Sequence, residues 1–512
     1  MSQWIIRRGA ASLLSYLKIW AAKSYFGLFL GIAFVAVHGL DILTYPLVGF
    51  DEVFLNDAGW QLVATGQFRA DVLSLSHGFE SHYFWQPPAL PLIAAFVYRL
   101  LGFGLWQTRL PSLLFGGLAV WAIFALVRHF RPRGLAASMA SLPLFFWPAF
   151  VLTAKTSRMD TGAIFALLLA TLWIARTLDR GEAAYKQAFI AGIFASVALM
   201  FHSASGPWAL ALLITLFLFS VRRINASVAY CCGAACLVVL WLLYAIQFPL
   251  EFDAQYLTHL AARTSGEGVF ERVLKQAKRY WTELYRLPIF YIVLALGIFG
   301  YSITPFPRDR HERILIVLTG LTVILTAFAT GSQNTGYYTT YPMTLAFCTI
   351  AIALEDVIFR ALEEGRRWFA AAAGLCVGAM VLNSFFASMG PRLLAYQFQG
   401  RERDYALQTS LLTARLKPGD QIWGRATLWF AATDAGARLQ AFDPIPPHTA
   451  TRPDPHRHRY VVVRRGEPFP GTESYEKLSE FGADLPLVLG SPLSDRPYAF
   501  DLWQSKEFMT SR

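Results

Sequence analysis

Charged residues and cysteine are both scarce in this sequence of 512 residues. Asp, Glu, Lys and Arg make up only 15% of it, whereas soluble globular domains carry about 25%, which excludes an ordinary soluble protein. The five cysteines all lie within apolar segments, at Cys231, Cys232, Cys236, Cys348 and Cys376. We therefore interpret them as buried thiols and not as a disulfide framework. Metal ligation by the three cysteines at 231–236 is the alternative, and a packed helix face accounts for them better.

Three further features are missing. No stripe of Lys and Arg interleaved with aromatic residues marks a nucleic-acid surface, so the net charge of +11 does not indicate a nucleic-acid partner. No segment repeats at a fixed period. Residues 1–24 hold four basic residues, no acid and no small-residue cleavage site, so they predict a retained cytoplasmic amphipathic helix rather than a signal peptide. Such a helix is also suited to lie on anionic lipid.

Long apolar segments are abundant instead. They include Ile164–Ala175, Ala209–Val221, Ala229–Ile246, Ile314–Ala329 and Phe369–Val381. A helix needs about 20 apolar residues to cross the hydrocarbon core of a bilayer. The sequence therefore predicts a polytopic α-helical membrane protein in contact with membrane lipids.

The basic residues between these segments set the predicted topology. Hydropathy alone would make Pro87–Leu105 a spanning helix. If this segment instead stays on the outer surface, as an interfacial or re-entrant helix, five successive basic clusters face the cytoplasm, as the positive-inside rule requires. About eleven spans follow, with the N-terminus inside and the C-terminus outside. They are 25–48, 110–128, 134–153, 162–178, 187–201, 206–221, 227–247, 287–304, 312–330, 338–357 and 368–388.

Residues 25–390 thus form a predicted transmembrane domain with four outer segments of interest. They are a first outer loop at 49–107, a short segment Lys155–Asp160, an outer loop at 249–286, and the segment Gly331–Pro342. The loop at 249–286 combines several Arg and Lys residues with Tyr and Trp.

Residues 391–512 are polar, contain no span, and predict a small α/β domain on the outer, periplasmic side. Short strands at Gln421–Trp423 and Tyr460–Val463 alternate with helical patterns at Tyr405–Leu416 and Tyr475–Phe481. The segment Pro444–Arg459 is typical of a loop. Its histidines (His448, His456 and His458) fit a solvated loop better than a metal site.

Two adjacent carboxylates, Asp51 and Glu52, follow the first apolar segment at the outer membrane boundary. A solvated loop start would explain such a pair, but this topology places Asp160 and several cations on the same face. A carboxylate there can deprotonate a hydroxyl or amine, and clustered cations at headgroup depth suit a lipid-linked phosphate. Tyr and Trp beside them suit sugar rings or the interfacial aromatic belt. For Asp160 and Arg158, a structural ion pair is the alternative.

Several motifs, taken in order, resemble the GT-C glycosyltransferases, nearest to the branch of the lipid A aminoarabinose transferase and the protein O-mannosyltransferases. The start of the resemblance is Gly49-Phe50-Asp51-Glu52, Ala58, Gly66, Pro87-Pro88, Leu101-Gly102 and Arg109-Leu110-Pro111-Ser112. Later parts are Ser157-Arg158-Met159-Asp160, Phe201-His202-Ser203 through Gly206, and Tyr337-Tyr338 through Pro342. The resemblance covers roughly residues 25–390.

This resemblance implies transfer of a sugar, with inversion, from a polyprenyl-phosphate donor at the outer face of the cytoplasmic membrane. Asp51 would be the catalytic base or orient the acceptor, with Glu52 and Asp160 nearby. The expected contacts of the donor phosphate are Arg158, Lys155, His202, Arg272, Lys275 and Arg279. The expected substrate-binding residues are His82, Gln86, Tyr337 and Tyr338. The acceptor is a lipid, a glycan or a protein.

The sequence departs from the family pattern at three donor contacts. Gln86 stands where a Lys often precedes Pro-Pro, His202 lies in a turn that usually holds a Lys, and Asn334 replaces a basic residue. No cofactor is assigned. A divalent cation at Asp51 and Asp160 is an alternative that the sequence leaves open, and the metal remains unknown.

Two other classes of function are compatible with parts of the sequence. A transporter or flippase for a lipid-linked sugar or glycan would also bind a polyprenyl phosphate. Such proteins usually carry ionisable residues near the membrane midplane and paired repeats, and neither is visible here. A membrane scaffold with a partner-binding C-terminal domain leaves the acid and base groups of the outer face unexplained.

Overall fold

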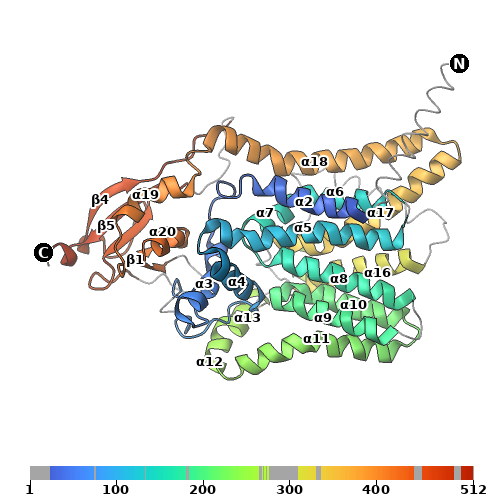
Figure 1. Ribbon diagram of the computed structural model, residues 1–512, viewed down its shortest axis with the longest axis horizontal. Helices are drawn as coiled ribbons and strands as arrows, with labels where there is room; N and C mark the ends of the chain where they lie inside the picture. Colours follow the sequence, from blue (N-terminus) through green and yellow to red (C-terminus); the bar gives the residue numbers. More distant parts are fainter. Residues whose placement is uncertain are drawn as a thin grey trace, which may run out of the picture.

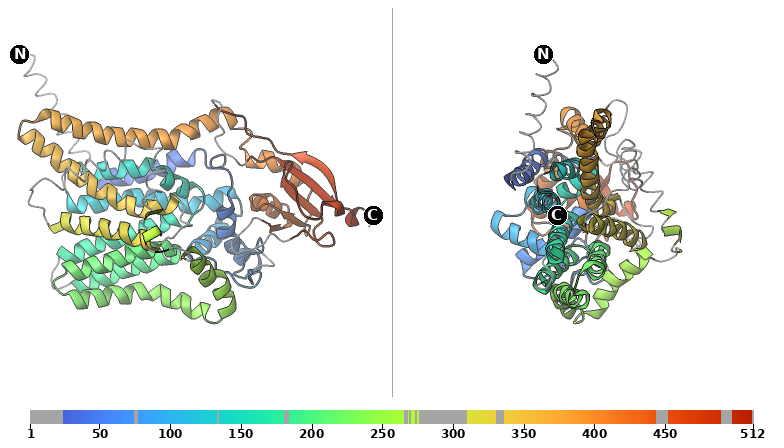
Figure 2. Two further views of the ribbon diagram at one scale, coloured as in Figure 1. Left: turned by 180° about the vertical axis from the view of Figure 1, so that it is seen from behind. Right: turned by 90° about the vertical axis from the view of Figure 1, so that its right-hand side faces the viewer.

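The computed structural model describes residues 24–73, 77–132, 134–179, 184–264, 268, 270–272, 274–275, 310–329, 336–442, 452–488 and 497–510. Long helices run side by side along the long axis, and a β-sheet lies at one end of this bundle (Figure 1). Short helices lie between the bundle and the sheet (Figure 2). The predicted N-terminal helix at 1–24 lies almost wholly outside the described residues.

The helices of the bundle are continuous apolar segments, as the sequence predicts. They are α2 (Ser24–Gly39), α5 (Leu105–Phe130), α6 (Ala136–Phe146), α7 (Pro148–Lys155), α8 (Asp160–Asp179), α9 (Ala184–Phe201), α10 (Gly206–Phe219), α11 (Arg223–Ala245), α16 (Arg310–Ala329), α17 (Thr340–Glu363) and α18 (Arg367–Gln399). Every predicted span within the described residues coincides with one helix, or with two in the case of 134–153. The first helix is shorter than predicted, because α2 ends at Gly39 and a turn follows. The predicted span 287–304 lies outside the described residues.

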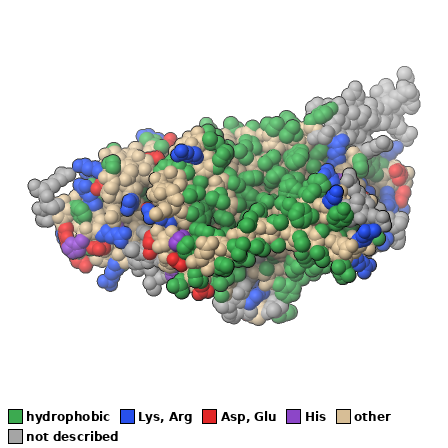
Figure 3. All heavy atoms as spheres, turned by 60° about the horizontal axis from the view of Figure 1, so that its bottom comes forward, with side chains coloured by type: hydrophobic (Ala, Val, Ile, Leu, Met, Phe, Trp, Pro, Cys, Tyr) green, Lys and Arg blue, Asp and Glu red, His purple; other side chains and the backbone are tan. Residues whose placement is uncertain are grey.

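Five helices of the described residues are long and apolar enough to cross a membrane, and the pair α6–α7 adds a sixth if it is one span. This pair is bent by 61° at the break between Phe146 and Pro148. Apolar side chains cover the flank of the bundle, and Lys and Arg collect toward its two ends (Figure 3). The protein is therefore a membrane protein with several apolar helices.

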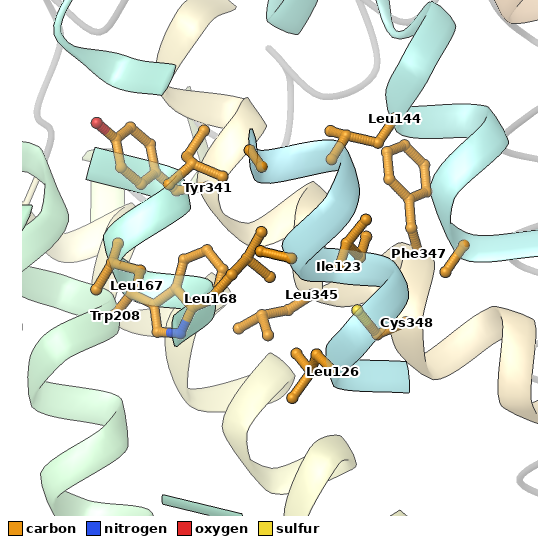
Figure 4. Close-up of a cluster of buried hydrophobic side chains, with 14 of the residues drawn as sticks. Ile123, Leu126, Leu144, Leu167, Leu168, Trp208, Tyr341, Leu345, Phe347 and Cys348 are labelled. Atoms are coloured by element: carbon orange, nitrogen blue, oxygen red, sulfur yellow. The ribbon is translucent and has the colours of Figure 1, made fainter. Parts of the chain in front are cut away.

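Close packing holds the bundle together. Buried side chains from α5, α8, α10 and α17 meet in its centre, among them Ile123, Leu167, Trp208 and Phe347 (Figure 4). Two glycines let α9 and α11 approach each other closely. A Cβ at Gly192 would lie 2.1 Å from the Tyr230 carbonyl oxygen, so only glycine fits there.

The prediction of buried thiols is wrong for three of the five cysteines. Cys231, Cys232 and Cys236 are exposed on α11, whereas Cys348 is buried in the bundle. The reason is that α11 lies at the edge of the bundle, so its apolar side chains face outward. All five cysteines are free.

The first outer loop contains two helices, α3 (Phe50–Thr65) and α4 (Ala89–Leu101). With 13 residues, α4 is shorter than a bilayer requires, which favours the predicted outer position of Pro87–Leu105. It lies directly against α3, because a Cβ at Gly59 would meet the Pro91 carbonyl oxygen at 2.4 Å. The loop after α11 begins with α12 (Pro249–Phe252), the π-helix η3 (Asp253–Leu257) and α13 (Thr258–Thr264).

The C-terminal residues form a five-stranded sheet with the strand order β2-β1-β3-β5-β4. Its elements are α19 (Tyr405–Arg415), β1 (Gln421–Gly424), α20 (Trp429–Asp434), β2 (Arg438–Ala441), β3 (Tyr460–Arg464), β4 (Tyr475–Phe481), β5 (Phe500–Ser505) and α21 (Glu507–Thr510). Strand β1 runs parallel to β2 and β3, while β5 runs antiparallel to β3 and β4. The predicted strands at 421–423 and 460–463 and the predicted helix at 405–416 are confirmed.

The predicted helix at Tyr475–Phe481 is wrong, because this segment is strand β4. Its apolar residues Tyr475, Leu478 and Phe481 recur every third position, which is typical of a helix. In the strand, a register shift between Lys477 and Ser479 puts Tyr475 and Phe481 on opposite faces of the sheet. Each is buried there in its own cluster, Tyr475 with Phe469 and Phe481 with Phe500.

Candidate active site

A buried guanidinium joins two of the predicted catalytic carboxylates. Arg158 donates through Nε to Asp160 Oδ2 at 2.9 Å, and through Nη1 to Asp51 Oδ2. The ring of Tyr337 lies over this guanidinium, with 4.2 Å from the ring centroid to Cζ. We call Asp51, Arg158, Asp160, His202 and Tyr341 the open cluster, because the Asp51 side chain remains 55% exposed.

The inner half of the open cluster is fully buried. The Tyr341 hydroxyl donates to Asp160 Oδ1 at 3.3 Å, and it lies 3.1 Å from His202 Nδ1. His202 Nδ1 is also 3.4 Å from Asp160 Oδ1. The Tyr338 ring lies 5.3 Å from the His202 ring, between their centroids. The structure therefore brings together residues from four of the predicted motifs.

A strained turn at Ser157 positions Arg158 and Asp160 next to one another. Ser157, just before them, has a φ of +47°, which costs a non-glycine residue of order 1–3 kcal/mol. Its hydroxyl lies 2.6 Å from the Thr108 carbonyl oxygen, and the Arg158 carbonyl oxygen accepts a hydrogen bond of 2.8 Å from Ser112. These bonds to α5 hold the turn in place, and α8 then begins at Asp160.

The charges of the open cluster favour a permanently charged arginine. Burial alone would lower the pKa of Arg158, but the carboxylates of Asp160 and Asp51 raise it above its ordinary value. Two carboxylates thus share one guanidinium, and only Asp51 of the two is open to solvent. Asp51 is therefore the carboxylate of this cluster that solvent can reach.

Glu52 lies on the other side of α3 and is buried. Arg109 donates to both of its oxygens, through Nε at 2.6 Å and Nη2 at 2.8 Å, and through Nη1 also to the Pro46 carbonyl oxygen at 3.0 Å. Such a two-bond pair is specific and rigid. The geometry gives Glu52 a positioning role at the start of α3, and Arg109 of the Arg-Leu-Pro-Ser motif is the partner that sequence reasoning missed.

Lys155 belongs to a different group, which we call the closed cluster: Asp41, Lys155, Arg392 and His38. Arg392 donates through Nε to Asp41 Oδ2 at 2.9 Å, and Lys155 Nζ donates to Asp41 Oδ1. The imidazole of His38 lies beside Arg392 and is 3.0 Å from the Phe145 carbonyl oxygen. The closed cluster ties α7 and α18 to the end of α2. No signal in the sequence would have paired Arg392 with Asp41.

The predicted substrate-binding residues of the first outer loop pack against other parts of the protein, with His82 partly exposed and Gln86 buried. His82 stacks on Phe248 with 3.6 Å between ring centroids, and its Nδ1 lies 3.6 Å from Glu251 Oε1. Gln86 is buried, and its Oε1 makes no hydrogen bond within the described part of the chain. Sequence reasoning missed Gln255, which is buried and binds the backbone of Phe84, His77 and His82. It fastens the two outer loops together.

The predicted donor contacts of the loop at 249–286 are placed only in part. Lys275 is exposed and lies 3.3 Å from Glu271. Arg272 is partly buried, and Arg279 lies outside the described residues, as does Asn334. Their contact with a donor phosphate stays a prediction.

No group of three or more His, Cys, Asp or Glu side chains suited to a metal ion occurs in the described ranges. Between Asp51 and Asp160, the guanidinium of Arg158 supplies positive charge where a divalent cation would have to sit. These two carboxylates therefore fit an arginine better than a metal. His458 is buried against Gln440, and His448 lies outside the described residues.

Known proteins resemble this chain in sequence and in fold. Residues 85–244 match the family model of the dolichyl-phosphate-mannose-protein mannosyltransferases. A comparison with curated proteins finds no match. The structure is similar to that of ArnT from Cupriavidus metallidurans bound to undecaprenyl phosphate, with a TM-score of 0.61, 15% identity, and coverage of 94% of this chain and 98% of that one.

Two other glycosyltransferase structures are also similar. The archaeal oligosaccharyltransferase AglB from Archaeoglobus fulgidus, in complex with an inhibitory peptide and a dolichol-phosphate, has a TM-score of 0.52 at 12% identity, with coverage of 86% of this chain and 69% of that one. The arabinofuranosyltransferase AftD from Mycobacteria has a TM-score of 0.54 at 14% identity, with coverage of 94% and 41%. The resemblance to the GT-C glycosyltransferases is thus confirmed, and the chain has their fold.

Proposed function

We propose that this protein is an inverting glycosyltransferase that moves a sugar from a polyprenyl-phosphate carrier to a lipid, glycan or protein acceptor. The observation that carries the proposal is the exposed carboxylate of Asp51, held by the buried Arg158 within this fold. The ligands of the similar structures, undecaprenyl phosphate and dolichol-phosphate, support a polyprenyl-phosphate donor.

The proposed reaction is a single displacement. The acceptor oxygen or nitrogen attacks the anomeric carbon from the face opposite the phosphate, and its proton passes to the Asp51 carboxylate. The bond between the anomeric carbon and the phosphate oxygen breaks, and the polyprenyl phosphate leaves with the electron pair. Because the sugar phosphate is already activated, no covalent enzyme intermediate is needed.

Cationic groups stabilise the charge that develops on the leaving phosphate. Nη2 of Arg158 makes no hydrogen bond within the described part of the chain, because Nε and Nη1 serve the two carboxylates. We assign this nitrogen to the phosphate, together with Arg272, Lys275 and Arg279 of the loop at 249–286. His202 adds a charge when protonated. Lys155 and Glu52 are assigned to positioning, because both are buried in ion pairs of their own.

The proposed place of the reaction is the outer face of a bacterial cytoplasmic membrane. The N-terminus would be cytoplasmic and residues 391–512 periplasmic. This orientation rests on the basic clusters between the spans. It also puts Asp51 and the C-terminal sheet on one side, because α3, which carries Asp51, lies at the sheet end of the bundle (Figure 1).

The test uses purified protein in detergent, labelled polyprenyl-phosphate sugars and a membrane-lipid extract. Wild-type protein is expected to release label from the carrier into an acceptor fraction. A general base contributes roughly 10²–10⁴-fold, so Asp51→Asn should lose about that much turnover. Asp484→Asn, which alters an exposed carboxylate of the C-terminal sheet region, is the matched control and should keep full activity. Donor binding without turnover in wild type, across all acceptor fractions, would contradict the assignment and favour a carrier-binding protein or flippase.

A further inference from the structure

A cleft lies between the first outer loop and the C-terminal sheet. One hollow of about 170 Å³ is lined by Arg69, Asp71 and Glu80 from the loop and by Gln421, Arg438 and Gln440 from β1 and β2. A second hollow of about 190 Å³ shares Asp71 and Arg438 with the first. The Ala441 backbone N–H donates to the Val72 carbonyl oxygen at 2.9 Å, so the loop continues the edge of the sheet and keeps the cleft in shape.

Side chains that donate and side chains that accept hydrogen bonds both line the first hollow. The side chains of Arg438 and Glu80 take part in no hydrogen bond or ion pair with any described residue, so a donor and an acceptor are both available. A carboxylate or phosphodiester ligand only accepts hydrogen bonds at neutral pH, so a carboxylate in the wall of a site cannot donate to it. A hydroxyl both donates and accepts, so this lining suits a ligand with many hydroxyl groups.

The orientation of Gln440 supports this interpretation. The Asp454 backbone N–H donates to His458 Nδ1 at 2.9 Å, so the ring proton sits on Nε2, which lies 2.7 Å from Gln440 Oε1. Burial, helped by the charge of Arg457, lowers the pKa of His458 to about 4 and keeps this tautomer neutral. The side-chain oxygen of Gln440 therefore already accepts a hydrogen bond, and its amide NH₂ remains available to donate to a ligand in the cleft.

The second hollow adds aromatic surface. It is lined by Trp60 of α3 and Trp429 of α20, together with the polar side chains of Gln61 and Thr433. An indole offers a flat apolar face beside polar groups, which matches the mixed faces of a sugar ring.

We propose that this cleft binds a saccharide that is part of the acceptor. The naming of the ligand as acceptor rests on the proposed function, whereas the binding itself does not. Trp60 is nine residues beyond Asp51 on α3, which corresponds to roughly 14 Å along the helix axis. The bound saccharide is therefore a distant part of the acceptor and not the group that receives the sugar.

Binding is measured without donor, by saturation-transfer NMR on the full chain in detergent. The probes are cellobiose, maltotriose, chitotriose, digalacturonate and inorganic phosphate. At least one saccharide should bind the wild type, and Arg438→Gln and Gln440→Leu should each weaken that binding at least fivefold. Arg415→Gln changes an exposed arginine that does not line the cleft and should bind as wild type does. Asp51→Asn should also bind normally, which separates this proposal from the proposed catalysis.

Three results would overturn the inference. The first is binding of inorganic phosphate alone, lost in Arg438→Gln, which would make the cleft an anion site. The second is equal binding of every saccharide by wild type and both cleft variants. The third is no saccharide binding at all by folded wild-type protein. Once an acceptor is known, Arg438→Gln should raise its KM and leave kcat unchanged, because the contact is made equally in the ground and transition states.

Discussion

The open and closed clusters combine carboxylates with Arg or Lys in opposite proportions. In the open cluster, Asp51 and Asp160 share one guanidinium, that of Arg158. In the closed cluster, Lys155 and Arg392 share the single carboxylate Asp41. The Asp51 side chain is 55% exposed, whereas that of Asp41 is 10% exposed.

This difference distinguishes a carboxylate that can exchange a proton with a ligand from one that only holds helices together. A carboxylate that is surrounded by two cations and closed off from solvent cannot meet a substrate, so it can only hold helices together. A carboxylate that shares one cation and reaches solvent can accept a proton. The residue type and its place at the membrane boundary are therefore insufficient to identify a candidate acid or base. The solvent exposure of the side chain is needed as well.

The largest expected effect on stability comes from breaking the closed cluster. Asp41→Asn leaves Lys155 and Arg392 buried without a counter-charge, which should cost about 3–5 kcal/mol of unfolding free energy. Thermal unfolding in detergent measures this loss. Asp484→Asn is the control, and an unchanged unfolding temperature in Asp41→Asn would refute a structural role for the cluster.

Asp57 sharpens the comparison, because it is a buried carboxylate that makes no ion pair with any described residue. Burial, with a small contribution from the charge of Asp71, raises its pKa to about 7, although Val72, Gln61 and Trp429 donate hydrogen bonds that oppose the shift. The folded state therefore binds more protons than the unfolded state between about pH 4 and 7. Stability should be highest below this window and fall as pH rises through it, by up to about 4 kcal/mol.

Asp57→Asn should remove this part of the pH dependence. The measurement is the unfolding temperature of both proteins between pH 4 and 8. Parallel curves for wild type and variant would show that Asp57 does not titrate in the window.

Sequence patterns predicted the helices and most members of the open cluster. Apolar segments fix the helices because their length and lack of charge leave no alternative in a membrane. Asp51, Arg158, Asp160 and His202 were expected on one face because the loop charges set the topology. The partners Arg109 and Arg392 were missed, because each lies 57 or more positions from the carboxylate it binds.

The roles within neighbouring pairs could not be predicted. Asp51 and Glu52 are adjacent, but consecutive side chains of a helix point about 100° apart, so one is exposed and the other buried. Lys155 and Arg158 are three positions apart, but the positive φ of Ser157 turns the chain between them and sends them to different clusters.

A conservative change at the centre of the open cluster should have an intermediate effect. Arg158→Lys keeps the charge but not the flat fork that reaches two carboxylates at once. The loss of one charge-assisted hydrogen bond, about 1.5–3 kcal/mol, should lower turnover roughly 10- to 100-fold. Initial rates of the folded variant measure this change. Rates equal to those of the wild type would show that only a positive charge is needed at this position.

The smallest expected effect comes from the buried half of the open cluster. Tyr341→Phe removes a hydroxyl that donates to Asp160 at 3.3 Å. A net loss of about 0.5–1.5 kcal/mol in unfolding free energy should follow. Tyr396→Phe, which removes the hydroxyl of an exposed tyrosine on α18, is a matched control. A loss of unfolding free energy above about 3 kcal/mol would contradict this small contribution of the Tyr341 hydroxyl.

The most direct test compares Asp51→Asn with Asp41→Asn in one assay of sugar transfer per folded molecule. The account predicts that Asp51→Asn keeps its unfolding temperature and loses turnover roughly 10²–10⁴-fold. Asp41→Asn should lose stability and keep the turnover of its folded fraction within a few fold of wild type. Turnover of Asp51→Asn within twofold of wild type would contradict the assignment of Asp51 as the base.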